Sequence, residues 1–190
     1  MVSSLMVGNI LESYACSGYL TWTNDAKLIG GVGDYGNHIR RYWVDSSASG
    51  FDTLIGNARY DWVNTSSILT TSIYIRKATQ QSSSVFDIYY TQAYPSGIGI
   101  LAESLFYDSS NNNISGTPSA DYKWTEIILN GTNFFNLSTF NQQGTISHEF
   151  GHCMGLAHST DTGRIMTQLG NGRTVNSPAY DDLDTINHLY

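Results

Sequence analysis

The sequence is poor in charged side chains and in proline, and it has no long apolar run. Only 13% of its 190 residues are charged, and its 9 Lys and Arg residues are scattered rather than clustered. The net charge of -7 therefore argues against a nucleic-acid partner. No apolar run approaches membrane-spanning length, so we expect no membrane span. With only 3 prolines and no change in composition along the chain, nothing divides it into two domains.

The N-terminus also lacks a recognisable signal peptide. Residues 1–6 are too few and too polar for one, so either the chain is intracellular or a presequence is missing from it. Ser, Thr, Asn, Gly and Tyr are abundant, a mix that is common in secreted microbial enzymes. With 41% hydrophobic residues, a chain of this length can bury a substantial core.

One short segment, H-E-F-G-H-C-M-G-L-A-H at 148–158, carries most of the chemistry. On a helix, His148 and His152 lie four residues apart, so both imidazoles leave the same face and can bind one metal ion. Gly155 allows the left-handed backbone that ends a helix, and the turn can bring His158 back to the same ion. Three protein ligands and an open fourth position are typical of a catalytic zinc.

The alternative interpretation of this segment is a helix with surface histidines and an incidental glutamate. The short string H-E-x-x-H does recur by chance, but the added glycine and third histidine at fixed offsets favour a zinc site. Glu149 lies between two candidate ligands, close enough to hold a metal-bound water without being a ligand. We therefore predict that Glu149 is a general base that takes a proton from the metal-activated water.

Hydrophobic periodicity and turn residues predict the remaining elements. Strands are expected at 19–23, 69–76, 85–91, 98–107 and 123–129. Helices are expected near 50–64 with Ser49 as N-cap, from about Phe140 to Gly155 with a Thr139–Gln142 capping box, and after Ser177-Pro178 with Asp181 and Asp182 in the first turn.

The segment 148–158 resembles the long zinc-binding motif of the metzincin metalloproteases, H-E-x-x-H-x-x-G-x-x-H, and matches it at every defined position. Two further segments are similar to the matrixin branch. GILAESLF at 99–106 resembles the matrixin edge strand G-x-L-A-H-A-x-F, and YDDLDTINHLY at 180–190 resembles its C-terminal helix D-D-[IL]-x-x-I-x-x-L-Y. The resemblance runs from about Gly97 to the end, and the first hundred residues agree only in the order of their elements.

This resemblance implies an α+β, zincin-like fold. We expect a twisted five-stranded mixed sheet with three helices, and an active-site cleft between an upper and a small lower subdomain. The whole chain would be one metalloprotease catalytic domain. Within it we expect an N-terminal segment at 1–18, an upper subdomain at 19–157 that includes the zinc helix, and a lower subdomain at 158–190.

The resemblance also gives further residues a role. Met166 would lie in a tight turn beneath the zinc ligands, as packing and not as a ligand. Two residues later, astacins and serralysins have a tyrosine ligand. Gln168 stands there in this chain, which disfavours that neighbouring branch of metzincins as an alternative.

The activity that the resemblance implies is a zinc-dependent endopeptidase acting on extended protein substrates. A peptide would add to the exposed edge of the sheet as a further strand. The residues expected to contact it are Gly99, Ile100, Leu101 and Ala102. The segment 166–177 would wall the pocket for the side chain that follows the cleaved bond.

We further expect a secreted, monomeric protein. The rival function is a catalytically inactive zinc-binding module of metzincin fold that serves in adhesion or regulation, and the intact Glu149 argues against it.

Histidines are scarce outside the motif, and this argues against a second zinc site. Matrixins of vertebrates hold a structural zinc with three histidines and an aspartate, but this chain keeps only His38 and His188 beyond the catalytic three. Glu103 stands where the edge strand of the family has histidine. We predict one zinc per chain. Glu103 and several Asp residues could supply oxygen ligands for a structural calcium.

The cysteines leave two alternatives open. No propeptide motif of the matrixin type, P-R-C-G-x-P-D, is present, and Cys16 lacks its flanking residues. Cys16 could place a thiolate on the zinc, or it could form a disulfide with Cys153, whose more favoured place is the core.

Overall fold

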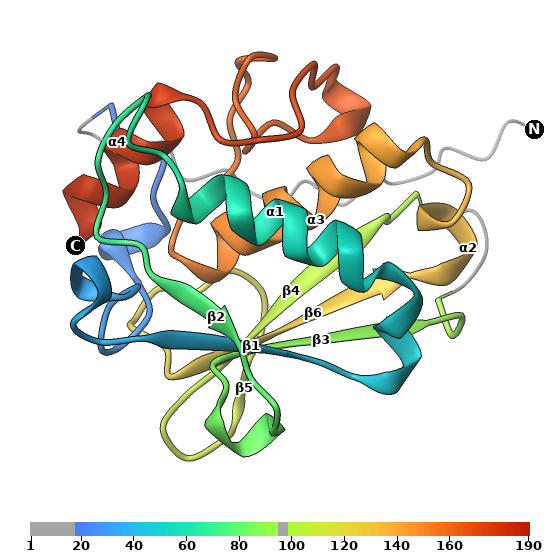
Figure 1. Ribbon diagram of the computed structural model, residues 1–190, viewed down its shortest axis with the longest axis horizontal. Coiled ribbons are helices and arrows are strands. Elements are labelled where there is room, and N and C mark those ends of the chain that lie inside the picture. The colour runs from blue at the N-terminus through green and yellow to red at the C-terminus, as the bar shows by residue number, and fades with distance from the viewer. Residues whose placement is uncertain (1–17, 95–98) are drawn as a thin grey trace, which may run out of the picture.

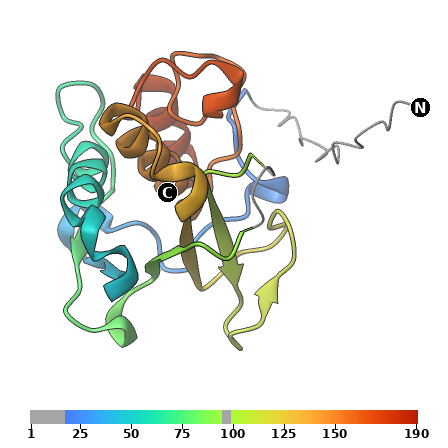
Figure 2. The ribbon, with the colours of Figure 1, turned by 90° about the vertical axis from the view of Figure 1, so that its right-hand side faces the viewer.

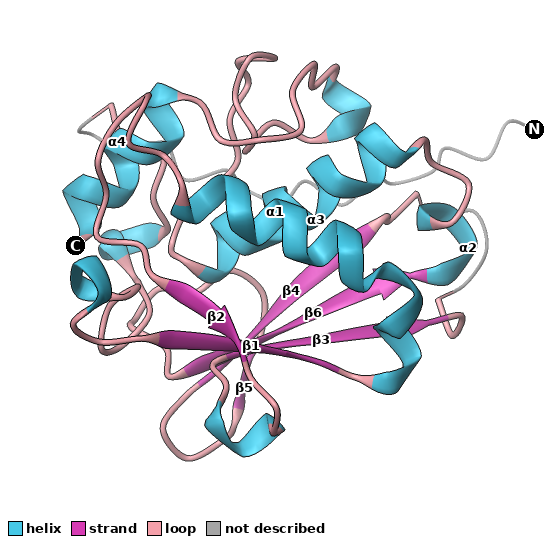
Figure 3. Cartoon of the chain, in the orientation of Figure 1, coloured by secondary structure: helices cyan, strands magenta, loops and turns pink. Residues whose placement is uncertain are grey.

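The computed structural model describes residues 18–94 and 99–190, and these residues fold around one mixed sheet of six strands in the order β2-β1-β3-β6-β4-β5 (Figures 1 and 3). Four strands run parallel, namely β1 (Arg40–Val44), β2 (Ile75–Lys77), β3 (Phe86–Thr91) and β6 (Trp124–Asn130). Two complete the sheet in antiparallel pairings, namely β4 (Ala102–Tyr107) against β6 and β5 (Asn113–Ile114) against β4. The expected α+β class is thus found, and the sheet is mixed as predicted.

Two long helices cover one face of this sheet. The described residues contain four α-helices, one more than the three predicted, because the four-residue α2 is too short to show a periodic pattern. They are α1 (Asp52–Val63), α2 (Gly131–Phe134), α3 (Thr139–Cys153) and α4 (Tyr180–Leu189). Figures 1 and 2 show α1 and α3 on the same side of the sheet, and these two helices contact each other. The core lies between them and the strands.

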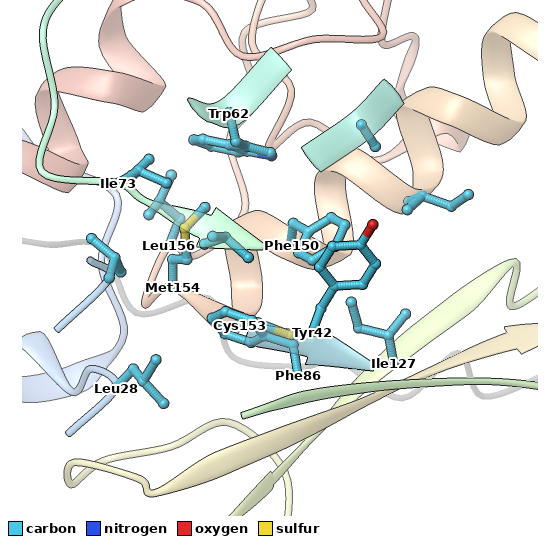
Figure 4. Packing of buried hydrophobic residues seen from close by; sticks show 14 of the residues in the cluster. Leu28, Tyr42, Trp62, Ile73, Phe86, Ile127, Phe150, Cys153, Met154 and Leu156 are labelled. Atoms are coloured by element: carbon cyan, nitrogen blue, oxygen red, sulfur yellow. The ribbon is translucent and has the colours of Figure 1, made fainter. Parts of the chain in front are cut away.

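The alternation of side chains along β6 explains how the sheet faces this core. Thr125, Ile127 and Leu129 are buried, whereas the residues between them are partly exposed, as the period of two in a strand requires. From the helix side, Phe150 packs edge-on against Phe86 of β3, with ring centroids 6.1 Å apart (Figure 4). Burial of apolar surface between the two layers fixes α3, and hence its histidines, over the sheet.

The helix that carries the histidines begins at Thr139, one residue earlier than predicted. Ser138, not Thr139, is the N-cap, and its Oγ accepts a hydrogen bond from the Asn141 N–H at 3.3 Å. The last helix begins at Tyr180, and Asp181 and Asp182 lie in its first turn as predicted. These carboxylates face the positive end of the helix dipole.

The expected sheet of five strands was wrong in its N-terminal part. Residues 19–23 do not form a strand of the sheet, and only Thr21 makes an isolated bridge, to Leu156. The sheet instead contains β1, between β2 and β3, which sequence reasoning missed because the strand opens with two arginines and only three residues of it are apolar or aromatic. The short β5 was missed as well, because two residues give no periodicity.

Two further elements differ from their predicted bounds. The predicted strand 69–76 is reduced to β2, because the residues before it bind a loop instead: Tyr74 N–H donates to the Val32 carbonyl at 2.9 Å. The helix near 50–64 is not capped by Ser49. A 3-10 turn at Ser46–Phe51 precedes α1, and Asp45 caps that turn by accepting from the Ser47 N–H at 2.8 Å.

Other predictions about organisation are tested only in part. Of the predicted N-terminal segment 1–18, all but Gly18 lies outside the described residues, as does Cys16. Among the helices that the structure describes, none is long and apolar enough to cross a membrane. The division into two subdomains with a cleft between them stays a prediction.

Candidate metal centre and active site

Two histidines project from one face of α3 at its C-terminal end. His148 and His152 are 5% and 6% exposed, and their ring centroids lie 4.5 Å apart. The helical repeat of 3.6 residues brings side chains four positions apart onto the same face. The sequence prediction that these two rings face one point is thus supported by their separation.

The third histidine reaches the same point through a tight turn. Gly155 follows the helix with a φ of +104°, a conformation that side chains other than glycine rarely adopt. The turn brings His158 to the other two, and its Nε2 lies 3.1 Å from His152 Nε2. One ligand atom from each of the three rings lies within 4.8 Å of the others, and this is the only such group of three metal-binding side chains among the described residues.

Backbone carbonyls fix the tautomers of two of these rings. His148 Nδ1 donates to the Ile165 carbonyl and His152 Nδ1 donates to the Leu156 carbonyl, both at 2.8 Å. With the proton on Nδ1, each Nε2 presents a lone pair, as a metal ligand must. Burial and the neighbouring histidines lower the pKa of His148 well below its usual value and that of His152 to about 3, so both rings are neutral at neutral pH.

This donor set fits a zinc ion. Nitrogens that share a tetrahedral zinc, with bonds of about 2.0–2.1 Å, lie about 3.3 Å apart, close to the 3.1 Å between His152 Nε2 and His158 Nε2. Neutral imidazoles with their lone pairs directed inward are the ligands that zinc binds without displacing a proton. His148, His152 and His158 would hold the ion and leave one coordination position open.

A buried carboxylate lies next to the histidines. Glu149 is 4% exposed, and its Oε2 accepts a hydrogen bond of 2.8 Å from the hydroxyl of Ser104 on β4. Burial raises the pKa of Glu149 to about 7, although the Ser104 hydrogen bond and the charge of Arg173 oppose that rise. A carboxylate that titrates near neutral pH is suited to accept and return a proton.

Sequence reasoning did not predict the contact of Ser104 with Glu149, although a signal was present. The matrixin strand pattern has alanine at this position, and the serine here adds a hydroxyl within reach of Glu149. The signal was not used because a strand pattern does not show which residue of α3 lies opposite.

Two aromatic residues that sequence reasoning also missed support the metal-binding end of α3. The indole of Trp22 stacks on the imidazole of His152, with ring centroids 5.0 Å apart, and its Nε1 donates to the His152 carbonyl at 3.3 Å. The hydroxyl of Tyr122 donates to the His152 carbonyl at 3.3 Å and to the Cys153 carbonyl at 2.9 Å. Both residues thus bind carbonyls of the last turn of α3, where the His152 carbonyl also accepts from the Gly155 N–H at 3.0 Å.

The turn that carries His158 is held by the N-terminal region. The Ala157 N–H donates to the Leu20 carbonyl at 2.8 Å, and Thr21 forms a bridge with Leu156. The residues predicted as a strand of the sheet thus hold the turn that positions the third histidine.

Met166 lies where a packing residue under the histidines was predicted. Its side chain is fully buried, and its sulfur lies against Gly151 of α3, where a Cβ would collide with it. The Met166 carbonyl accepts from the Ser159 N–H at 2.9 Å. Asp182 holds the same turn, because its Oδ2 accepts from the Ile165 N–H at 3.0 Å and from the Ala179 N–H at 2.9 Å.

The predicted substrate-contacting residues lie at and just before β4. Ala102 is the first residue of the strand and pairs with Leu129 of β6, whereas Gly99, Ile100 and Leu101 precede the strand. The Ile100 carbonyl accepts from the side-chain amides of Asn130 and Asn133, at 2.6 and 2.9 Å. On the other side of β4, β5 pairs only with Phe106 and Tyr107, so no described strand pairs with Ala102 to Leu105 there.

The remaining histidines and Gln168 lie apart from the metal centre. His38 Nδ1 lies 3.2 Å from an Asp34 oxygen, and His188 stacks on Tyr19 with centroids 4.1 Å apart. The Gln168 side chain accepts a hydrogen bond from Asn171.

Comparison with known families agrees with this geometry. The matrixin family matches residues 99–190, which include β4, the three histidines, Met166 and α4. The chain is matrixin-like. The recognition of a matrixin-like metzincin catalytic domain is thus confirmed, and the matched family is one of zinc metallopeptidases.

The expected calcium site and the expected core position of Cys153 have different outcomes. The calcium expectation has no support, since Glu103 belongs to no group of three candidate ligands in the part of the chain that the structure describes. Cys153 is a buried free thiol in the core, as favoured, and burial raises its pKa to about 12. A thiol so far from ionisation is unreactive.

Proposed function

We propose that the chain is a secreted, zinc-dependent endopeptidase that hydrolyses peptide bonds in extended protein substrates. The observation that carries the proposal is the convergence of three imidazoles, two of them kept neutral by burial, beside a buried carboxylate, Glu149, whose pKa is raised to about 7. A bound zinc supplies Lewis acidity and lowers the pKa of a coordinated water to about 7. His148, His152 and His158 would be its ligands.

Glu149 is the general base in this proposal. Its carboxylate accepts the proton of the attacking water and returns it to the leaving amine. The Ser104 hydroxyl, at 2.8 Å, holds Oε2 in place and leaves the second oxygen to accept that proton. Tight burial keeps bulk water away from the carboxylate, so its orientation is set by protein groups.

The substrate binds along β4 in this proposal. An extended peptide can pair with unpaired backbone groups of an edge strand. Because the Ile100 carbonyl already accepts two hydrogen bonds, the free positions for pairing lie from Ala102 to Leu105, toward the C-terminal side of the predicted contact residues. Gly99, Ile100 and Leu101 would shape the entrance to this edge, and the segment 166–177 would wall the pocket for the side chain after the cleaved bond.

The test is cleavage of a peptide library by the zinc-loaded protein, read by mass spectrometry. We expect internal cleavage that a chelator abolishes and that added zinc restores. Glu149→Ala should lower kcat/KM by about 1000-fold, within the range of general-base contributions, while one zinc per chain stays bound. Zinc binding without any cleavage by the unmodified protein would favour the inactive adhesion or regulatory module instead.

A further inference from the structure

Arg173 is a buried charge that forms no ion pair with a carboxylate of the described residues, although the charge of Glu149 acts on it. Its side chain lies in the segment between Met166 and α4, and only 6% of the residue is exposed. Nη2 donates a hydrogen bond to Thr145 Oγ1 at 3.3 Å, while the buried Nε has no hydrogen-bond partner in the described part of the chain. Among the described residues, no Asp or Glu forms an ion pair with this guanidinium.

The guanidinium lies against the face of α3 that carries the candidate catalytic residues. Thr145 is three residues before His148 and four before Glu149, so all three share one helix face. Gly144 permits the close approach, because a Cβ there would lie 3.0 Å from Nη2 of Arg173. Burial lowers the pKa of Arg173 to about 10, while the charge of Glu149 opposes that shift, so Arg173 keeps its charge at neutral pH.

A guanidinium that is buried without a carboxylate ion pair favours an anionic ligand. Arginine has five N–H donors, and among the described residues Arg173 makes one side-chain hydrogen bond, to Thr145. An unpaired buried charge is costly, whereas a carboxylate can accept two parallel hydrogen bonds from the planar guanidinium and neutralise it. An aliphatic side chain placed beside Arg173 would leave that charge and its donors without a partner.

We infer that Arg173 determines specificity in the pocket for the substrate side chain that follows the cleaved bond, and that this pocket selects a carboxylate, Glu or Asp. The inference rests on the proposed function, which places the segment 166–177 along that pocket. It goes beyond that function by naming the substrate class: proteins cleaved on the N-terminal side of acidic residues.

A purely structural role for Arg173 makes a different prediction. Residues 173–176 pack on the start of α3, since a Cβ at Gly144 would lie 3.1 Å from Asn176 Cα and 3.2 Å from the Val175 carbonyl. If Arg173 served only to hold this segment, its loss would lower stability and overall activity without changing the preferred substrate. The ratio of rates between two substrates therefore separates the two roles.

The experiment measures kcat/KM of the zinc-loaded protein for three peptides that differ only after the scissile bond, with Glu, Gln or Leu. For the unmodified protein we expect Glu to exceed Leu by about 30-fold or more, the effect of losing one partner of a buried charge pair. Gln, which has the shape of Glu without its charge, should fall between them. Arg173→Met should remove the preference for Glu, and Arg173→Lys should retain part of it. Arg41→Gln, at an exposed position of β1, is the matched control for the lost charge and should change nothing.

Two results would overturn the inference: equal or faster cleavage of the Leu peptide by the unmodified protein, or an unchanged Glu preference in Arg173→Met. Circular dichroism and zinc content show whether Arg173→Met folds. If it does not, the ratio of kcat/KM for the Glu and Leu peptides in the unmodified protein and in Arg173→Lys tests the inference. If the unmodified protein cleaves none of the peptides, the proposed function fails. Fluorescence anisotropy of the labelled Glu and Leu peptides then tests the pocket by binding alone, and equal binding would overturn the inference.

Discussion

The two halves of the molecule contribute to the metal centre in different ways. Residues 99–190 contain all three candidate ligands, the candidate base and the whole family match. Residues 18–94 contain none of the ligands, yet Trp22 stacks on His152 and Leu20 binds the turn before His158. One short segment therefore supplies the candidate catalytic side chains, whereas residues more than a hundred positions away hold that segment in place.

The largest expected effect comes from removing a ligand in the C-terminal half. His152→Ala should reduce zinc content from one per chain to near zero and reduce peptide cleavage to the chelated background, because two imidazoles hold the ion too weakly. Metal analysis and cleavage assays measure this. His38→Ala, exposed and outside the triad, is the control and should keep one zinc. A second bound zinc in the unmodified protein would contradict the single site.

A tryptophan in the N-terminal half should have the next largest effect. Trp22→Ala removes the ring that stacks on His152, and loss of such support typically lowers metal affinity about 10- to 100-fold. It also leaves a cavity that costs about 3–5 kcal/mol of unfolding free energy. Competition with a chelator and thermal unfolding measure the two effects.

The matched control for this variant lies in the other half. Trp124→Ala removes an indole that stacks on Tyr107, with centroids 3.9 Å apart, away from the histidines. It should leave the zinc affinity unchanged. If both variants lowered zinc affinity equally, the stacking of Trp22 on His152 would have no specific role.

A smaller effect is expected at the contact between β4 and α3. Ser104→Ala removes the hydroxyl that holds Glu149 Oε2, and we expect kcat to fall about tenfold, the value of one hydrogen bond to a charged group, with KM little changed. Ser104→Thr keeps a hydroxyl and should restore most of kcat. A rise in KM with constant kcat would show instead that this position serves substrate binding.

The smallest effect is expected at Tyr122. Tyr122→Phe removes the hydroxyl that donates to the His152 and Cys153 carbonyls while the ring stays in the core. Unfolding free energy should fall by about 1 kcal/mol, as measured by denaturant titration, and zinc stoichiometry should stay at one. Loss of zinc from this variant would mean that the end of α3 depends on that hydroxyl far more than its hydrogen bonds suggest.

Sequence reasoning was accurate for helices and strands whose bounds depend on their own residues. The bounds of α3, β3 and β6 were predicted to within two residues, because apolar periodicity and helix caps are local signals. It failed at residues 19–23, whose aromatic, β-prone side chains suggested a strand. Those residues instead bind the turn after α3, a pairing that no local pattern reveals.

The sequence by itself identified the candidate metal-binding residues and the resemblance to the matrixin family. His148 and His152 lie four positions apart on α3, and Gly155 turns the chain just after that helix ends, so local geometry is enough to make these two residues and His158 candidate ligands. Only the tertiary structure decided what surrounds them. Trp22 lies 130 positions from His152, and Ser104 lies 45 from Glu149. Contacts over such separations arise from packing of the whole chain. Burial then raises the pKa of Glu149 and leaves Nε of Arg173 without a hydrogen-bond partner among the described residues.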